Sequence, residues 1–246
     1  MNDRLGERMK RYEGVSRHFL IRRTPVIIRL DGCHFHNFTR DFSKPYDEIL
    51  CRTMQETMKY LCQNIQGCVL GYTQSDEITL VLCDYQRITS EAWFGNNLQK
   101  LCSVSASMAT MIFNKVFTYL ADKDGRYPYS IAKEKGATFD ARAFNIPKEE
   151  VNNCLVWRQL DAQRNSIQGL GQQYYTNKQL LKKTCRDILD MLNTELEISW
   201  ETDVPTKFKR GSCCIKTDEG WTIDNEIPDF ISNKDYVSDR IMFDDD

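Results

Sequence analysis

Three acidic residues stand where short apolar runs end, which is where metal-dependent chemistry would be expected. Asp31 follows the run Val26–Leu30 and precedes Gly32, and Asp76 and Glu77 separate two further apolar runs. Magnesium prefers oxygen ligands and takes one or two carboxylates together with substrate phosphates. Two such ions about 3.5 to 4 Å apart can activate an attacking oxygen and stabilise a leaving pyrophosphate. Asp31 and Asp76 are therefore candidate ligands for two metal ions.

The residues around these acids suit a nucleoside triphosphate. Gly32 would let backbone N–H groups approach a phosphate closely, and Arg29 and Lys44 are cations that can neutralise its charge. Turns favour the same residue types, however, so an Asp-Gly turn at Asp31 and a solvated hairpin tip at Asp76 explain the pattern without catalysis. On spacing alone, both interpretations stay open.

Hydrophobic periodicity predicts the elements that would bring these acids together. Strands are expected at Val26–Leu30, Cys68–Tyr72, Ile78–Leu82 and Ala137–Asp140, and helices at Tyr46–Asn64 and Asn97–Leu120. The order strand, helix, strand, strand, helix, strand is that of an α+β, ferredoxin-like split βαβ sheet with covering helices on one face. In such a sheet the first strand lies beside the hairpin, so Asp31 would meet Asp76 and Glu77.

The remainder of the chain is predicted to be mainly helical. A helix is expected in much of the first 23 residues, with later helices at 149–165 and 177–196, a break at Gly169–Gly171 and a strand near Ser212–Lys216. Because no repeat or long linker is evident, a helical region 146–246 is expected to pack on a catalytic region 1–145 as one compact unit. The acidic end Asp244–Asp246 is expected to fray.

Composition indicates an ordinary globular protein of the cytoplasm. The chain has 246 residues, 41% of them hydrophobic, and no window approaches the roughly 18 uninterrupted apolar residues of a membrane span. Its ten cysteines are scattered, no CxxC occurs and only three histidines are present. This pattern favours reduced, mostly buried thiols over disulfides or a zinc site.

The formal net charge of -2 excludes a generally basic nucleic-acid-binding protein. Any nucleic-acid contact must therefore come from local basic patches, for which the sequence offers Arg11, Arg17, Arg22 and Arg23, or Lys207, Lys209 and Arg210. Each patch alone is equally well explained as a solvated surface.

Two motifs resemble those of the histidine-tRNA guanylyltransferase family and its relatives, the reverse-direction (3′-to-5′) tRNA polymerases. The first motif, R-x-D-G followed by F-H-x-F and F-x-K-P-x-D, occupies Arg29 to Asp47, and the second, Q-S-D-E, occupies Gln74 to Glu77. The similarity extends through Phe139–Arg142 and Lys209–Gly211, so it covers most of the chain. These long motifs, in order, are far more specific than either carboxylate alone.

The resemblance implies a polymerase palm-like catalytic region in which Asp31, Asp76 and the Gly32 carbonyl bind two Mg²⁺ ions and Glu77 is a supporting acid. It further implies a set of nucleotide-binding residues, consisting of Arg29, Gly32, Cys33, His34, Phe35, His36, Lys44 and Ser75. Family members activate a 5′-monophosphorylated tRNA with ATP or GTP, and the 3′-hydroxyl of an incoming nucleotide then attacks the activated end. The family also implies a homotetramer.

Departures from the eukaryotic pattern indicate a branch of this family. Tyr46 stands where eukaryotic members usually have Asn, and Cys33 stands where Arg is common. The eukaryotic H-I-N-N-L-Y-N segment is absent, and Arg158–Ser166 occupies the corresponding region. The chain therefore resembles the bacterial and archaeal members, which favour template-dependent repair of 5′-truncated tRNA over addition of one untemplated G to histidine tRNA.

Two other functions fit parts of this pattern. A palm-type nucleotide cyclase or diguanylate-type enzyme would also place acids after its first strand and at a hairpin, although no G-G-D-E-F type hairpin is present. A non-catalytic RNA-binding module would have no need for the pair Asp31 and Asp76.

Overall fold

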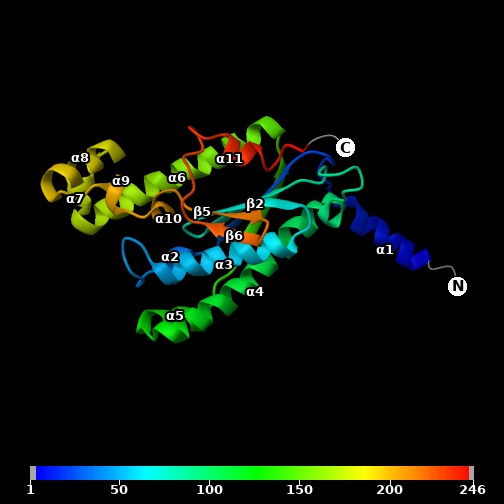
Figure 1. Ribbon diagram of the computed structural model, residues 1–246. Helices are drawn as coiled ribbons and strands as arrows, with labels where there is room; N and C mark the ends of the chain where they lie inside the picture. Colours follow the sequence, from blue (N-terminus) through cyan, green and yellow to red (C-terminus); the bar gives the residue numbers. More distant parts are fainter. Residues whose placement is uncertain (1–3, 244–246) are drawn as a thin grey trace.

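A single antiparallel sheet organises the chain in the computed structural model, which describes residues 4–243 (Figure 1). Its strands are β1 (Val26–Gly32), β2 (Cys68–Gln74), β3 (Glu77–Leu82), β4 (Phe139–Asn145), β5 (Ser212–Thr217) and β6 (Gly220–Asp224). They are arranged in the order β4-β1-β3-β2-β5-β6. The first four strands form the expected split βαβ sheet, with β1 paired to β3 and to β4, and a second hairpin extends the sheet beyond β2.

Helices cover both faces of the sheet. The helices α3 (Glu48–Asn64) and α4 (Leu98–Asp124) pack on one face, and α6 (Lys148–Tyr174) lies across the other (Figure 1). Alternation along β1 explains the two layers, since Val26, Ile28 and Leu30 join the core under α3 and α4 while Ile27 joins the core under α6. Asp31 lies four residues after Ile27, so its side chain points to the same face of β1 as that of Ile27, toward α6.

The hairpin that carries two of the candidate acids is tighter than the sequence predicts. A five-residue connection was expected between β2 and β3, but β2 continues to Gln74 and β3 begins at Glu77. Only Ser75 and Asp76 form the turn, with Ser75 in the left-handed region at φ 50°. Glu77 is thus a strand residue whose side-chain direction is fixed by the pleat.

The predicted break at Gly169–Gly171 is wrong, because α6 runs through both glycines to Tyr174. A Cβ at Gly171 would lie 2.8 Å from a methyl carbon of Ile188. The glycine therefore allows close packing of α8 (Cys185–Leu196) against α6 rather than ending the helix. This packing forms a third apolar cluster, which includes Leu170, Ile188 and Leu192.

Shorter elements complete the chain. They are α1 (Arg4–Val15), α2 (Phe35–Phe38), the 3₁₀ turn η1 (Trp93–Asn96), α5 (Tyr127–Lys135), α7 (Asn177–Leu180), α9 (Trp200–Asp203), α10 (Thr206–Lys209) and α11 (Asp235–Ser238). Helix α1 is shorter than predicted, has no buried residue and projects from the body at the end opposite to α7 and α8 (Figure 1). The tail Asp244–Asp246 lies outside the described residues.

The structure also shows the state of the cysteines and the character of the helices. All ten cysteines are free, and five of them are buried. Among residues 4–243, no helix is long and apolar enough to cross a membrane. The division at residue 145 stays a prediction, and β5 and β6 from the second region belong to the same sheet as β1 to β4.

Candidate active site

Three carboxylates stand side by side at one end of the sheet. Asp31 of β1 pairs in register with Glu77 of β3 on one side and with Asp140 of β4 on the other. Residues directly opposite one another in an antiparallel sheet project from the same face, so these acids share the α6 face. Asp140 was part of a recognised motif but was not among the predicted site residues. Its position across from Asp31 depends on strand register, which the sequence alone does not show.

The hairpin turn brings the fourth acid to the same edge. The backbone N–H of Gly32 donates to the carbonyl oxygen of Asp76 at 3.1 Å, which joins the end of β1 to the turn. Ser75 Oγ donates to Asp76 Oδ1 at 3.1 Å. The predicted meeting of Asp31 and Asp76 is thereby supported by a backbone contact between their segments.

The electrostatics of this edge favour a bound cation. Burial raises the pKa of Asp76, and the nearby charge of Asp31 adds to that rise, while hydrogen bonds from Ser75 and from the Asp76 backbone oppose it. A divalent cation beside two neighbouring carboxylates stabilises their charged forms. Within the described part of the chain, no group of three or more His, Cys, Asp and Glu side chains forms a metal cage. The pair nevertheless fits Mg²⁺, which uses substrate phosphates as further ligands.

Glu77 is held by a buried arginine rather than lying free at the hairpin tip. Arg158 Nε of α6 lies 2.7 Å from Glu77 Oε1, and both side chains are only 9% exposed. Arg158 also pairs with Asp161 at 2.9 Å. Burial raises the pKa of Glu77, while the charges of Arg158 and Arg29 oppose that rise. This ion pair fixes the middle of α6 to β3, the strand that follows the turn formed by Ser75 and Asp76.

Arg29 lies on the same face, two residues before Asp31. Its guanidinium carbon is 5.4 Å from the centre of the Trp157 ring, a cation-π distance. Its Nε is buried and has no hydrogen-bond partner among the described residues. A buried donor without a partner is costly, so an anionic ligand at this face would satisfy a group that the protein leaves unpaired.

The segment after Asp31 places the side chains of residues 34–36 in two different environments, buried and exposed. Phe35 is buried and packs on Phe113 and Phe139, and its ring occupies the space into which a Cβ on Gly32 would project, at 2.2 Å. Only the backbone of Phe35 can therefore serve a ligand. His34 and His36 are exposed, and His34 has a left-handed φ of 57°.

Two of the predicted phosphate-binding amides are already used within the protein. The N–H of Gly32 binds the Asp76 carbonyl, and the N–H of Cys33 donates to the carbonyl of Thr138 at 2.8 Å. The amides of residues 34–36, at the start of α2, are the ones left to face a phosphate. Phosphate binding was predicted for the whole Gly32–His36 backbone, and the structure leaves only the amides of residues 34–36 free for it.

Lys44 lies in a loop that Asp47 organises. Asp47 accepts hydrogen bonds from the backbone N–H of Ser43 at 3.0 Å and of Leu50 at 2.9 Å, the second of which caps α3. Tyr129 of α5 donates to the same carboxylate at 2.6 Å. Lys44 itself is exposed and forms no ion pair with the part of the chain that the structure describes.

A cavity of about 170 Å³ opens beside the hairpin turn. Its walls include the polar side chains of Gln74, Ser75 and Asn165 and the rings of Tyr46 and Phe208. Those two rings are stacked, with centroids 4.7 Å apart and planes 9° apart. Tyr46 was predicted only as a departure from the family pattern, and its pairing with Phe208 joins residues far apart in the sequence.

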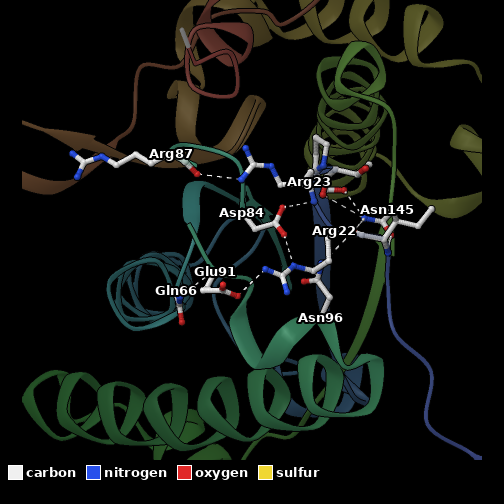
Figure 2. A network of polar contacts seen from close by, with 11 residues as sticks. Arg22, Arg23, Gln66, Asp84, Arg87, Glu91, Asn96 and Asn145 are labelled. Carbon is white, nitrogen blue, oxygen red and sulfur yellow. Dashed lines mark hydrogen bonds and ion pairs between the residues drawn. The ribbon is translucent and has the colours of Figure 1, made fainter. Parts of the chain in front are cut away.

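The basic patches predicted from sequence are largely neutralised inside the protein. Arg22 pairs with Asp84 and Glu91 at 2.9 and 2.8 Å, whereas Arg23 donates its backbone N–H to Asp84 and its guanidinium to the Arg87 carbonyl, as Figure 2 shows. This network lies at the start of β1, the end of the strand opposite to Asp31. It holds the segment before β1 in place rather than serving the site.

The second predicted patch is also occupied. Lys207 pairs with Glu48 at 2.7 Å, and Arg210 pairs with Glu201 at 3.2 Å. Lys209 is only 5% exposed and donates to the Glu201 carbonyl. Among the described residues, only Arg11 and Arg23 of the two patches form no ion pair with a carboxylate.

Comparison with known proteins agrees with this geometry. The family model for tRNAHis guanylyltransferase (Thg1) matches residues 6–147. The structure is similar to a bacterial tRNA(His) guanylyltransferase (Thg1)-like protein in complex with ATP, with 44% identity, a TM-score of 0.89 and coverage of 98% of this chain and 100% of the other. A bacterial Thg1-like protein in complex with GTP is 40% identical, with a TM-score of 0.79 and coverage of 97% and 100%.

A curated relative gives the same result at lower identity. A probable tRNA(His) guanylyltransferase from Mus musculus is 28% identical over 221 residues, which are 82% of this chain and 69% of the mouse protein. The matched model includes both carboxylate segments and the strands that position them. The chain is therefore a nucleotidyltransferase that belongs to the tRNAHis guanylyltransferase family.

Proposed function

We propose that this chain adds nucleotides to the 5′ end of tRNA in the 3′-to-5′ direction, and that its main task is template-dependent repair of 5′-truncated tRNA. The observation that carries the proposal is the meeting of Asp31 and Asp76 at one sheet edge, joined through the Gly32 to Asp76 backbone hydrogen bond. Family membership supplies the reaction class, and the bound ATP and GTP of the two bacterial relatives support the nucleotide substrates. Addition of G to histidine tRNA is the narrower form of this chemistry.

The residues of the site have distinct roles in this proposal. Asp31, Asp76 and the Gly32 carbonyl would hold two Mg²⁺ ions, and the chemistry supplied there would be stabilisation of the charge on the phosphate under attack and on the leaving pyrophosphate. Glu77 supports them from its ion pair with Arg158. The amides of residues 34–36, together with Lys44, Ser75 and the unpaired Arg29 Nε, bind the triphosphate.

The cavity beside the turn is the place for a nucleoside in this scheme. It offers apolar walls for a base, and the amide groups of Gln74 and Asn165 can pair with the polar edge of that base. Ser75 lines the cavity and also touches Asp76, so a nucleoside seated there would have its phosphates directed to the carboxylates.

Assembly and location complete the proposal. A homotetramer follows from the family, and the exposed Leu5, Met9 and Tyr12 of α1 support an association surface. Light scattering tests it, and a monomer at all working concentrations would remove the idea. A cytoplasmic location is proposed because tRNA is the substrate.

The experiment that tests the metal assignment is Asp76→Asn with the natural protein as its control. We expect loss of 5′ addition with unchanged tRNA affinity, since a neutral amide keeps the shape of the turn but not the charge that holds Mg²⁺. Unchanged 5′ addition would show that the assignment is wrong. Incubation with nucleotides alone tests the cyclase alternative, which requires cyclic or linear dinucleotide products.

A further inference from the structure

A basic tip stands at the far end of α6, and its cations form no salt bridge with the described residues. We use the name α7–α8 tip for residues 172–186, which contain no acid and carry four cations, namely Lys178, Lys182, Lys183 and Arg186. All four are exposed, and none forms a salt bridge with another residue of the described chain. A chain with a net charge of -2 thus carries a local cluster of positive charge at this end.

The tip differs in this respect from the patches that the sequence singled out. Arg22, Lys207 and Arg210 are paired with carboxylates, and Lys209 is buried. Asp187, the first acid after the tip, caps α8 by accepting from the N–H and Oγ of Thr184 at 2.7 and 2.9 Å. These hydrogen bonds lower the pKa of that carboxyl group, and Lys183 and Arg186 help to lower it but form no salt bridge with it, so the four exposed cations of the tip are available to an anionic partner.

The position of the tip relative to the site follows from α6. Arg158, near the middle of that helix, contacts Glu77, and the helix continues for sixteen residues to Tyr174. At 1.5 Å per residue, the end of α6 lies about 24 Å along the helix axis from the contact between Arg158 and Glu77 of β3. Figure 1 shows α7 and α8 at that end of the molecule, opposite to α1.

The surface between the site and the tip is continuous. The cavity beside Ser75 and a second groove share Pro45, Tyr46 and Phe208 in their walls. The second groove reaches Tyr174, which is 51% exposed and lies four residues before Lys178. Its two acids are engaged, because Glu48 pairs with Lys207 and Asp203 accepts from the Ser199 N–H at 2.8 Å. Polar, aromatic and basic groups thus follow one another away from the carboxylates.

We propose that the α7–α8 tip binds the phosphate backbone of the RNA whose 5′ end occupies the catalytic edge. Exposed lysines and arginines without internal partners are the groups that neutralise phosphates without reading sequence. A contact some 24 Å from the reacting end would hold a base-paired stem against the groove and position its terminus. The inference rests on the proposed function, because it concerns the same RNA substrate.

The test uses two matched variants of the full chain. In the tip variant, Lys178, Lys182, Lys183 and Arg186 are all replaced by Gln. In the control variant, four cations of α4 and α5 are replaced by Gln, namely Lys100, Lys115, Lys123 and Lys135. Both variants lose four positive charges from exposed positions, but the control charges lie on the α4 side of the sheet, away from α6 (Figure 1). Circular dichroism and thermal melting establish that both remain folded.

Binding is measured with a 5′-monophosphorylated tRNA transcript at several salt concentrations. We expect the tip variant to bind at least about tenfold more weakly, with a log K against log salt slope shallower by about 3, since each lost phosphate contact removes about 0.7 to 0.9 from the slope. Its KM for NTP and its kcat at saturating RNA should equal those of the natural protein. The control variant should keep most of the affinity and slope.

Several results would overturn the inference. An RNA affinity and a salt slope of the tip variant equal to those of the natural protein would do so. Equal losses of RNA affinity in the tip and control variants would do so too, because the effect would then come from the net charge of the protein and not from the location of the four cations. A changed oligomeric state with unchanged RNA binding would assign the tip to another copy of this chain. Extension by the natural protein is scored in the same preparations. If it extends tRNA while the tip variant binds normally, only this inference fails, whereas no extension by the natural protein refutes the proposed function.

Discussion

Removing the arginine that holds Glu77 should destabilise the protein strongly. Arg158→Met keeps most of the side-chain volume but deletes the charge 2.7 Å from Glu77 Oε1. Because both side chains are only 9% exposed, solvent screens the pair weakly, and the remaining carboxylate would be buried without its ion-pair partner, keeping a long hydrogen bond of 3.4 Å from Thr79 Oγ1. Breaking such a pair costs about 3 to 5 kcal/mol, which for a chain of this length lowers Tm by roughly 6 to 20 °C.

The pH dependence of this loss has a defined sign. Burial already raises the pKa of Glu77, and Arg158 opposes that rise, so the variant should raise this pKa further. An acid whose pKa is higher in the folded state binds more protons there, and stability then falls as pH rises above the ordinary glutamate range. The deficit of Arg158→Met should therefore be larger at pH 8 than near pH 5.

A double-mutant cycle separates this pair from general damage. Chemical denaturation is measured for Arg158→Met, for Glu77→Gln and for the double variant, each at pH 8 and pH 5. We expect the double variant to be more stable at pH 8 than the sum of the single losses implies, since it leaves no buried charge. A single-variant loss below about 1 kcal/mol at pH 8, or additive losses, would refute the account of the pair.

Three further predictions concern the loop and the carboxylates. Lys44→Ala should raise KM for NTP much more than the Kd for tRNA, and equal losses in both would contradict its triphosphate role. Tyr129→Phe should lower the free energy of unfolding, measured by urea denaturation, by about 1 to 2 kcal/mol. It should also raise KM for NTP, because Asp47 loses the 2.6 Å hydrogen bond that holds the loop of Lys44 in place. A KM equal to that of the natural protein would show that Tyr129 does not act on nucleotide binding. Because burial and Asp31 raise the pKa of Asp76, the Mg²⁺ concentration for half-maximal rate should increase as pH falls through that raised pKa, and a pH-independent requirement between pH 5 and 8 would argue against direct binding.

The sheet could be predicted from sequence because local signals agree with the final fold. The apolar run before Asp31, the helical period of the following segment and the polar turn at Asp76 each point to the same split βαβ order, which the structure confirms, although α3 begins at Glu48 and not at Pro45. The turn was predicted too long because polar residues such as Gln74 and Glu77 read as loop, whereas strand pairing and Arg158 stabilise them within the sheet.

Other parts of the site depend on contacts between distant segments, which a single sequence does not show. A break was predicted at Gly169–Gly171 because the helix propensity of glycine is low. The helix continues there because the close packing of Ile188 against Gly171 leaves no room for a larger side chain. The stacking of Tyr46 on Phe208 and the opposition of Asp31 and Asp140 require the register of the sheet and the path of the C-terminal segments. The same applies to the paired state of Arg22 and Lys207, which composition counts as available charge.

The central claim is that the chain extends tRNA at its 5′ end. It is tested most directly by incubating the pure protein with Mg²⁺, all four NTPs and a 5′-monophosphorylated tRNA that lacks its first nucleotide, and by resolving the products on a sequencing gel. The account predicts 5′ extension by the nucleotide that pairs with the opposing 3′ strand, and G addition regardless of that strand would assign the histidine-specific form. No extension, even of a tRNA that already bears a 5′-triphosphate, would contradict the account.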